Sequence, residues 1–189
     1  MPRAGLTEAT VIEEAERLAD EVGLSNLTLA ALALRVGVRQ PSLYKHIAGM
    51  DALQRSIAIR AKNELAAVLG RAAVGRARGD GLAAMAHAYR GWALRHPARY
   101  ASAQRAPLPG DLDDEAASAS VVQVAFEVMA GFELRDDDAV DAIRALRAAL
   151  HGFVALESGG GFGLPVSIDR SFDRLVAGLD AAFTAWGSR

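Results

Sequence analysis

Apolar residues recur at spacings of three and four along almost the whole chain, and this period constrains the fold more than any other feature. The stretch from Val11 to Val22 has such a stripe, and later segments repeat the pattern. Alanine is abundant, and β-branched residues seldom alternate with polar ones for even five positions, so helix propensity and periodicity agree. We expect an all-α fold of about nine helices.

Capping residues and glycines predict where these helices begin and end. Thr7 and Thr28 can cap helices that stop at Gly23 and Gly37. A further short helix is expected from Gln40, with Pro41 in its first turn, to Gly49. Later helices are expected at about residues 51–74, 80–96, 112–131, 136–158 and 168–186, with Asp80 as a cap, a break or kink at Pro97 and a loop at 106–111.

The length of 189 residues, with 51% hydrophobic and 23% charged residues, suits a substantial core and excludes a disordered chain. The absence of cysteine excludes disulfides and thiolate chemistry. Residues 1–10 lack an apolar stretch of signal length, and no later run approaches the roughly 18 apolar residues of a membrane span. We therefore expect a cytoplasmic protein without a membrane partner.

The charge is unevenly distributed, although the formal net charge is only -2. Residues 35–62 hold six basic residues and one acidic residue, whereas residues 111–141 hold ten acidic residues and one basic residue. A basic patch near the N-terminus and an acidic far half predict that the molecule orients towards a polyanion.

The segment between Leu27 and Leu53 has the spacing of a helix-turn-helix. Two short helices meet at a three-residue turn around Gly37, where a Cβ would strain a positive φ and hinder close packing of the helices. Such a unit presents its second helix to the major groove of DNA, where glutamine can pair with adenine and hydroxyl groups can donate to phosphates. The side chains that supply this chemistry are Gln40, Ser42, Tyr44, Lys45 and His46.

Three parts of this segment are specific in residue type: Leu27-Thr28, Val36-Gly37-Val38, and the run from Pro41 to Ile47 that Leu53 follows. Over about residues 7 to 55 they resemble the DNA-binding domain of the TetR family of bacterial regulators. The resemblance implies a DNA-binding domain at residues 1–48, joined through the fourth helix to a ligand-binding and dimerisation domain at residues 49–189. The residues predicted to contact DNA are Thr28, Arg39, Gln40, Pro41, Ser42, Tyr44, Lys45 and His46.

One position departs from the family's pattern. The family usually has a lysine at the start of the fourth helix, where this chain has Met50, so a phosphate contact of the family lacks its usual side chain. The amide groups next to Gly49, or Arg55 from the next turn, are the candidates to replace that contact.

Several motifs in the C-terminal part resemble the TetR regulators that have a ligand domain of the Trp-His-Gly type. They are Tyr89-Arg90-Gly91-Trp92-Ala93, His96-Pro97, Tyr100, Leu150-His151-Gly152-Phe153 and Gly160-Gly161-Phe162-Gly163. Aromatic and methionine side chains in this region could line an apolar pocket, and they equally suit an ordinary helical core. The candidate pocket residues are Met85, Tyr89, Trp92, Phe126, Met129 and Phe153.

The last two helices carry broad apolar and small-residue faces. Such stripes usually belong to a core, yet TetR-like proteins dimerise by packing two such helices against their copies as a four-helix bundle. We therefore expect a homodimer. The residues predicted at its interface are Ala145, Ala149, Gly152, Phe172, Leu175, Leu179 and Phe183.

Together, these features predict a ligand-responsive repressor of nearby genes that binds a palindromic operator in double-stranded DNA and is released by an apolar or amphipathic effector. No cofactor is expected, and the wide spacing of the histidines argues against a metal site. No catalytic constellation can be identified, so an enzyme is not expected. The alternative is a helical small-molecule-binding or interaction protein without DNA-binding activity, which would not need the residues from Gln40 to His46.

Overall fold

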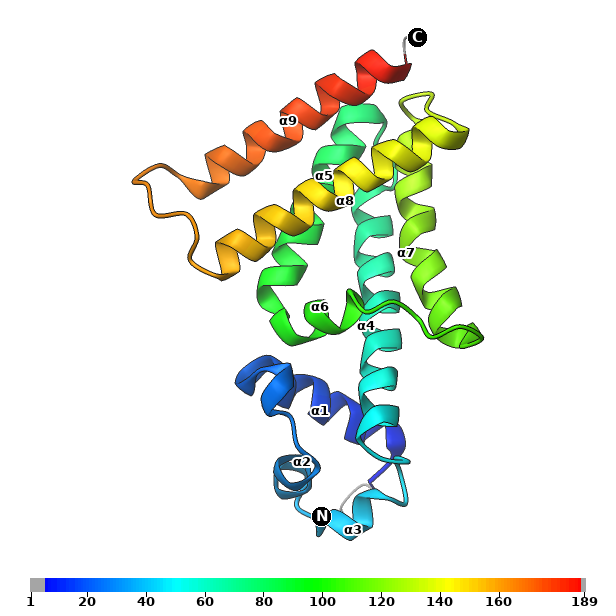
Figure 1. The fold of residues 1–189 in the computed structure, drawn as a ribbon, viewed down its shortest axis with the longest axis vertical. Helices are drawn as coiled ribbons and strands as arrows, with labels where there is room; N and C mark the ends of the chain where they lie inside the picture. Colours follow the sequence, from blue (N-terminus) through cyan, green and yellow to red (C-terminus); the bar gives the residue numbers. More distant parts are fainter. Residues whose placement is uncertain (1–5, 188–189) are drawn as a thin grey trace. The chain divides into compact units, whose positions relative to one another are not determined.

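The computed structural model describes residues 6–187, and every regular element in that range is a helix (Figure 1). This result confirms the predicted all-α class and the expected nine α-helices within the described residues, with a short 3₁₀ helix in addition. The helices are α1 (Glu8–Val22), η1 (Leu24–Asn26), α2 (Leu29–Val36), α3 (Gln40–Leu43), α4 (Met50–Ala73), α5 (Arg78–Arg95), α6 (Pro97–Ala103), α7 (Leu112–Ala130), α8 (Asp136–Ser158) and α9 (Ile168–Gly187).

Most helix ends lie where the capping residues predict them, and two expectations need correction. Thr7 caps α1, and Pro97 separates α5 from α6 because a proline interrupts the hydrogen bonding of a continuous helix. The helix expected from Gln40 to Gly49 ends at Leu43 and continues as tight turns, with the His46 amide donating to the Leu43 carbonyl at 2.8 Å. Asp80 lies inside the first turn of α5, which begins at Arg78, and so it does not precede that helix as a cap.

The chain forms two compact units. The first unit comprises Met1–Lys62 and His96–Ser118, and the second comprises Asn63–Arg95 and Ala119–Arg189. Residues 1–5 and 188–189 belong to these ranges but lie outside the described part of the chain. Helices α4 and α7 each contribute residues to both units.

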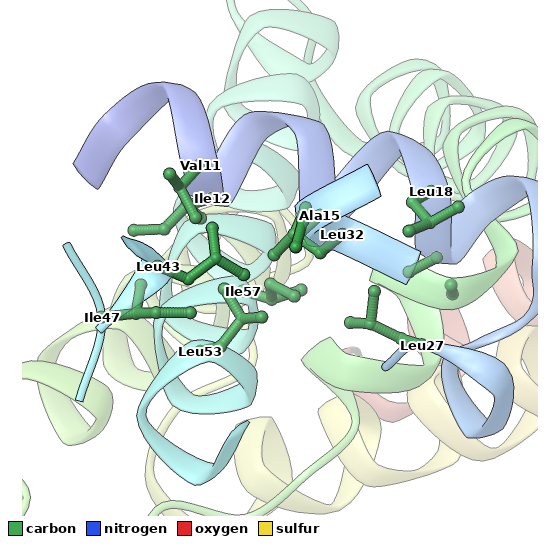
Figure 2. Packing of buried hydrophobic residues seen from close by; sticks show 13 residues of the cluster. Val11, Ile12, Ala15, Leu18, Leu27, Leu32, Leu43, Ile47, Leu53 and Ile57 are labelled. Atoms are coloured by element: carbon green, nitrogen blue, oxygen red, sulfur yellow. The ribbon is translucent and has the colours of Figure 1, made fainter. Parts of the chain in front are cut away.

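The core of the first unit holds two helices, α2 and α3, that are too short to be stable alone. Figure 2 shows side chains of α1, α2, α3 and the start of α4 meeting in one cluster. Leu32, Leu43 and Leu53 are completely buried there. Because burial of one leucine side chain stabilises a fold by about 1.5–3 kcal/mol, this cluster fixes the short helices around Gly37.

The second unit is organised around α5, α8 and α9, which pack against one another. After the loop at residues 159–167, α9 returns alongside α8 (Figure 1). Trp92, Phe172 and Phe183 are the largest buried side chains of this core. None of the described helices is both long enough and apolar enough to cross a membrane.

Candidate nucleic-acid interface

The turn between α2 and α3 is fixed at both ends of α2. The Thr28 hydroxyl accepts a hydrogen bond from the Ala31 amide at 3.1 Å, which caps the start of the helix. Gly37 adopts the left-handed conformation with φ 72°, and the Val38 amide donates to the Ala33 carbonyl at 3.0 Å. These bonds match the usual way in which a glycine ends a helix and redirects the chain. The chain therefore enters α3 with a defined direction.

Two buried side chains anchor α3 and the turn that follows it. Leu43 is completely buried, and Ile47 is 6% exposed. Because these two residues face the core, the polar side chains between and before them face outward. Tyr44 is 55% exposed, Gln40 and Lys45 are exposed, and Ser42 and His46 are half-buried. The residues that the sequence singled out around α3 are thus all at least partly accessible to solvent.

The predicted basic patch at residues 35–62 needs correction, because four of its six cations are engaged within the first unit. Arg35 donates to Glu14 at 2.9 Å and to Glu21 at 2.6 Å, and these contacts join α2 to α1. Arg60 donates to Glu16 at 2.7 Å, which joins α4 to α1. These guanidinium groups stabilise the unit instead of adding a free positive charge to its surface.

The other two engaged cations pair with the beginning of the acidic segment. Arg55 donates to Asp111 at 2.6 Å and to Asp113 at 3.0 Å. Lys62 donates to the fully buried Asp114 at 2.5 Å. The expected separation into a basic patch and an acidic far half is therefore wrong at this point, because the two segments neutralise each other inside one unit.

The remaining positive charges of that segment belong to Arg39 and Lys45. Within residues 6–187 neither side chain forms an ion pair, and both are exposed. Arg39 precedes α3 and Lys45 follows it, so both flank the surface that carries Gln40. Such cations suit contacts to DNA phosphates, as do the neighbouring hydroxyl groups of Ser42 and Tyr44, whereas the Gln40 amide suits a base edge.

The internal pairs persist at neutral pH because the carboxylates favour their charged form. Hydrogen bonds from Arg35 lower the pKa of Glu14 and Glu21 below the usual 4.5. The hydrogen bond from Arg55 lowers the pKa of Asp111 in the same way. The carboxylates that pair with Arg35 and Arg55 are thus charged at neutral pH, where the protein would bind DNA.

The ion pairs of Arg55 bear on which group could replace the missing lysine at Met50. Arg55 is held by two aspartates, which disfavours it as the replacement that the sequence allowed. Met50 is the first residue of α4 and packs against the core of the first unit. The amide groups next to Gly49 remain as the predicted phosphate contact.

The predicted pocket residues occupy two kinds of environment in the second unit. Met85, Tyr89, Trp92 and Met129 are buried, and the Trp92 indole donates to Glu64 at 3.1 Å. Phe153 is half-buried and packs against Phe162 and Phe172, with ring centroids 4.8 and 5.0 Å apart. Phe126 lies at an open groove, which α7 and α8 line. The pocket role of these residues remains a prediction.

The predicted dimer residues divide in a similar way. Ala145, Ala149, Gly152, Leu175 and Leu179 are half-buried on α8 and α9 and remain candidates for the interface. Phe172 and Phe183 are 0% and 1% exposed, so the prediction that they lie at the dimer interface is replaced by a role in the core of the single chain. Phe183 packs edge-on against Phe132, with ring centroids 5.9 Å apart.

Sequence reasoning missed the residue that ties α6 to α1. The Asp20 carboxylate accepts hydrogen bonds from the backbone amides of Ala98 and Arg99, at 3.0 and 3.2 Å, and from the Arg99 side chain at 2.8 Å. It thereby satisfies free amides at the start of α6. Its partners lie 78 and 79 positions away in the sequence, so no local pattern points to them.

Comparisons with known proteins agree with this geometry. A profile of bacterial regulatory proteins of the tetR family matches residues 11–57, and a profile of the tetracyclin repressor-like C-terminal domain matches residues 82–179. The chain is 36% identical over 191 residues to the HTH-type transcriptional regulator Rv0681 of Mycobacterium tuberculosis, with 98% of this chain and 87% of that protein covered.

Two further similarities span most of the chain. It is 32% identical over 157 residues to the HTH-type transcriptional regulator YobS of Bacillus subtilis, with 82% of this chain and 81% of that protein covered. A solved structure of a TetR variant from Acinetobacter baumannii in complex with minocycline matches with a TM-score of 0.72 and 26% identity, covering 98% of this chain and 100% of that one. This chain belongs to the TetR family and is a helix-turn-helix transcriptional regulator.

Proposed function

We propose that the protein is a repressor that leaves its operator when a small apolar or amphipathic molecule binds. The observation that carries the DNA-binding part is the exposed surface of α3, where buried Leu43 and Ile47 hold Gln40 and Lys45 outward. In this proposal the protein acts in the cytoplasm as a binding protein and not as an enzyme.

The operator is proposed to be a palindrome read by a homodimer. Two helix-turn-helix units reach successive major grooves when their recognition helices are about 34 Å apart, and two-fold symmetry of the protein then requires two-fold symmetry of the DNA site. The half-buried small and apolar residues of α8 and α9 support an interface in that part of the chain. Sedimentation should give a dimer at micromolar concentration, and a monomer there would contradict this part of the proposal.

We assign DNA binding to residues 1–48 and effector binding and dimerisation to residues 49–189. The two family profiles support an N-terminal DNA-binding part and a separate C-terminal part, because one matches residues 11–57 and the other residues 82–179, and the first of them continues past residue 48 into α4. A TetR relative solved with minocycline supports a small molecule as the effector of this chain too. The buried aromatic residues of the second unit, Tyr89 and Trp92 among them, are the proposed lining of its site.

The effector must favour a dimer geometry that binds DNA poorly, because a ligand shifts an equilibrium only by its difference in affinity for the two states. A typical coupling of about 1–3 kcal/mol corresponds to about 5- to 150-fold in affinity, and operator DNA must weaken effector binding by the same factor. A compound that binds without changing operator affinity, and whose own binding DNA does not change, would not be the effector.

The experiment that tests the proposal is a binding titration with the intergenic DNA next to the protein's own gene. Fluorescence anisotropy at moderate salt should give saturable binding to a palindromic segment and much weaker binding to a scrambled duplex of equal length. Equal affinity for both duplexes would contradict the regulator that we propose. Absence of any DNA binding would favour the alternative of a helical small-molecule-binding or interaction protein.

A further inference from the structure

The second unit contains an open groove, and Phe126 is the predicted pocket residue that lines it. The groove has a volume of about 660 Å³, and the C-terminal half of α7, the turn after it and the first turns of α8 line it. This volume lies within the range of about 300–1,000 Å³ that is typical of small-molecule sites. All of the lining residues belong to one compact unit.

The lining of the groove is largely apolar. The Phe126 side chain is 37% exposed there, which leaves part of an aromatic ring without a protein neighbour. Ala130 and Val140 continue this surface, and the buried Leu134 lies beneath it. A ligand that covers Phe126 would remove apolar area from water, and the face of the ring also attracts cations.

The charged lining of the groove is negative. Glu127, Asp136 and Asp137 contribute carboxylates, and Arg135 contributes the one cationic side chain among the lining residues. Within the described residues, Asp136 and Asp137 form no ion pair, and Glu127 accepts one hydrogen bond, from Gln123 at 3.3 Å. These carboxylates therefore retain their capacity to bind a cation from outside the chain.

Helix stability explains the aspartates but not Glu127. Asp136 and Asp137 lie in the first turn of α8, where negative charge interacts favourably with the helix dipole. Glu127 lies in the last turn of α7, where negative charge interacts unfavourably and where the turn holds no basic residue to offset it. Within α7, the hydrogen bond from Gln123 is the contact that favours this carboxylate, and its charge is not offset by a basic residue of the last turn.

We propose that this groove binds a small cationic amphipathic molecule, whose apolar part covers Phe126 and whose positive charge lies near the carboxylates of Glu127 and Asp137. The complementary charge selects against anions of the same shape, because they would face unpaired carboxylates. The inference does not depend on the proposed repressor activity, since the site forms within the second unit and its occupancy is measured without DNA.

The test is isothermal titration calorimetry of the full chain with two probes of nearly equal shape and opposite charge, tetraphenylphosphonium and tetraphenylborate. We expect the cation to bind with a stoichiometry of one per chain and at least tenfold more tightly than the anion. Equal affinities for the two probes would overturn the proposal, because they would show apolar binding without selection by charge.

Variants assign the binding to this groove. Phe126→Ala and Glu127→Gln should each weaken binding of the phosphonium ion by at least fivefold. The matched controls are Val122→Ala, an exposed apolar residue one turn earlier on α7, and Asp141→Asn, an exposed acidic residue on α8, because neither lines the groove. The controls should bind as the wild type does. A loss of affinity as large in the controls as in the groove variants would overturn the assignment.

A second copy of the chain is the competing occupant of this surface. Sedimentation velocity of Phe126→Ala distinguishes a small ligand from a second copy, since a residue of a ligand groove can be truncated without changing the association state. An unchanged sedimentation coefficient together with weakened phosphonium binding supports the proposal. Dissociation of an oligomer in this variant, with no phosphonium binding by the wild type, would identify the surface as a contact between copies.

Discussion

Gln40 and Lys45 are exposed at opposite ends of the same short segment, and their chemistry gives them different roles on DNA. An amide group can make two hydrogen bonds to adenine, whereas an ammonium group interacts with phosphates whatever the sequence. The sequence alone predicts both residues correctly as surface residues, because the apolar spacing of Leu43 and Ile47 defines which side of the segment is buried.

Replacing the amide should change base preference. Gln40→Ala is expected to cost about 1–3 kcal/mol on the preferred operator and to bring operator variants closer together in affinity. The measurement is a set of anisotropy titrations over single-base operator variants, with nonspecific DNA as the reference. Equal losses on every duplex would refute a base-reading role for this residue.

Replacing the ammonium group should weaken binding to all sequences alike. Lys45→Ala is expected to make the negative slope of log affinity against log salt shallower by about 0.9 for each protomer, because one phosphate contact is lost. Arg55→Gln is the control, since Arg55 is paired with Asp111 and should leave the slope unchanged. A slope that falls as much in the control as in Lys45→Ala would show that Arg55 reaches DNA after all.

The ion pairs between distant residues could not be predicted from the sequence. Arg60 and Glu16 are 44 positions apart, Lys62 and Asp114 are 52 apart, and Arg55 and Asp111 are 56 apart. Charge counted along a segment contains no information about partners at such distances. The same applies to the groove, whose walls depend on how α7 and α8 meet.

The ends of helices are easier to predict from the sequence than ion pairs, because caps and glycines act locally. Thr28 and Gly37 define the ends of α2 as expected, since their hydrogen bonds involve residues three to five positions away. The length of α3 is less predictable. Its last turn tightens where Leu43 and Ile47 enter the core, and that packing is a tertiary effect.

Gly37 provides a test of the turn between α2 and α3. Gly37→Ala should destabilise the fold by about 1–2 kcal/mol, because a Cβ disfavours φ 72° even though no atom lies within 4 Å of it. Gly178→Ala has equally free surroundings but lies within α9 without a positive φ, and it should stabilise by up to about 1 kcal/mol. Urea unfolding of the two variants measures both effects, and the same sign for both would contradict the account.

The pairs of Arg35 with Glu14 and Glu21 make the joint between α1 and α2 sensitive to acid. Because the folded pKa of each carboxyl lies below the unfolded value near 4.5, the stabilisation is present above that pH and is lost as the pH falls through the folded pKa. Arg35→Gln should therefore lower the Tm at pH 6 and have progressively less effect below about pH 4. Thermal unfolding across this range is the measurement, and a Tm difference independent of pH would contradict the assigned cause.

For the whole molecule, the main correction concerns electrostatics. The sequence predicts the all-α class, the helix-turn-helix and the family, since each of these follows from local periodicity and residue type. It does not predict that the beginning of the acidic segment neutralises cations near the DNA-binding helices. Of the six cationic side chains in residues 35–62, two are therefore available to DNA in each chain, Arg39 and Lys45.

We propose that a dimer binds its operator through the surface of α3 with these two cations from each protomer. The salt dependence of operator binding at pH 8 tests it most directly. Four phosphate contacts per dimer predict a slope of about -3.6 for log affinity against log salt, together with a preference for the palindromic duplex over a scrambled one. A slope near -11, as expected if all six cations of each chain reached phosphates, or equal affinity for both duplexes, would contradict the account.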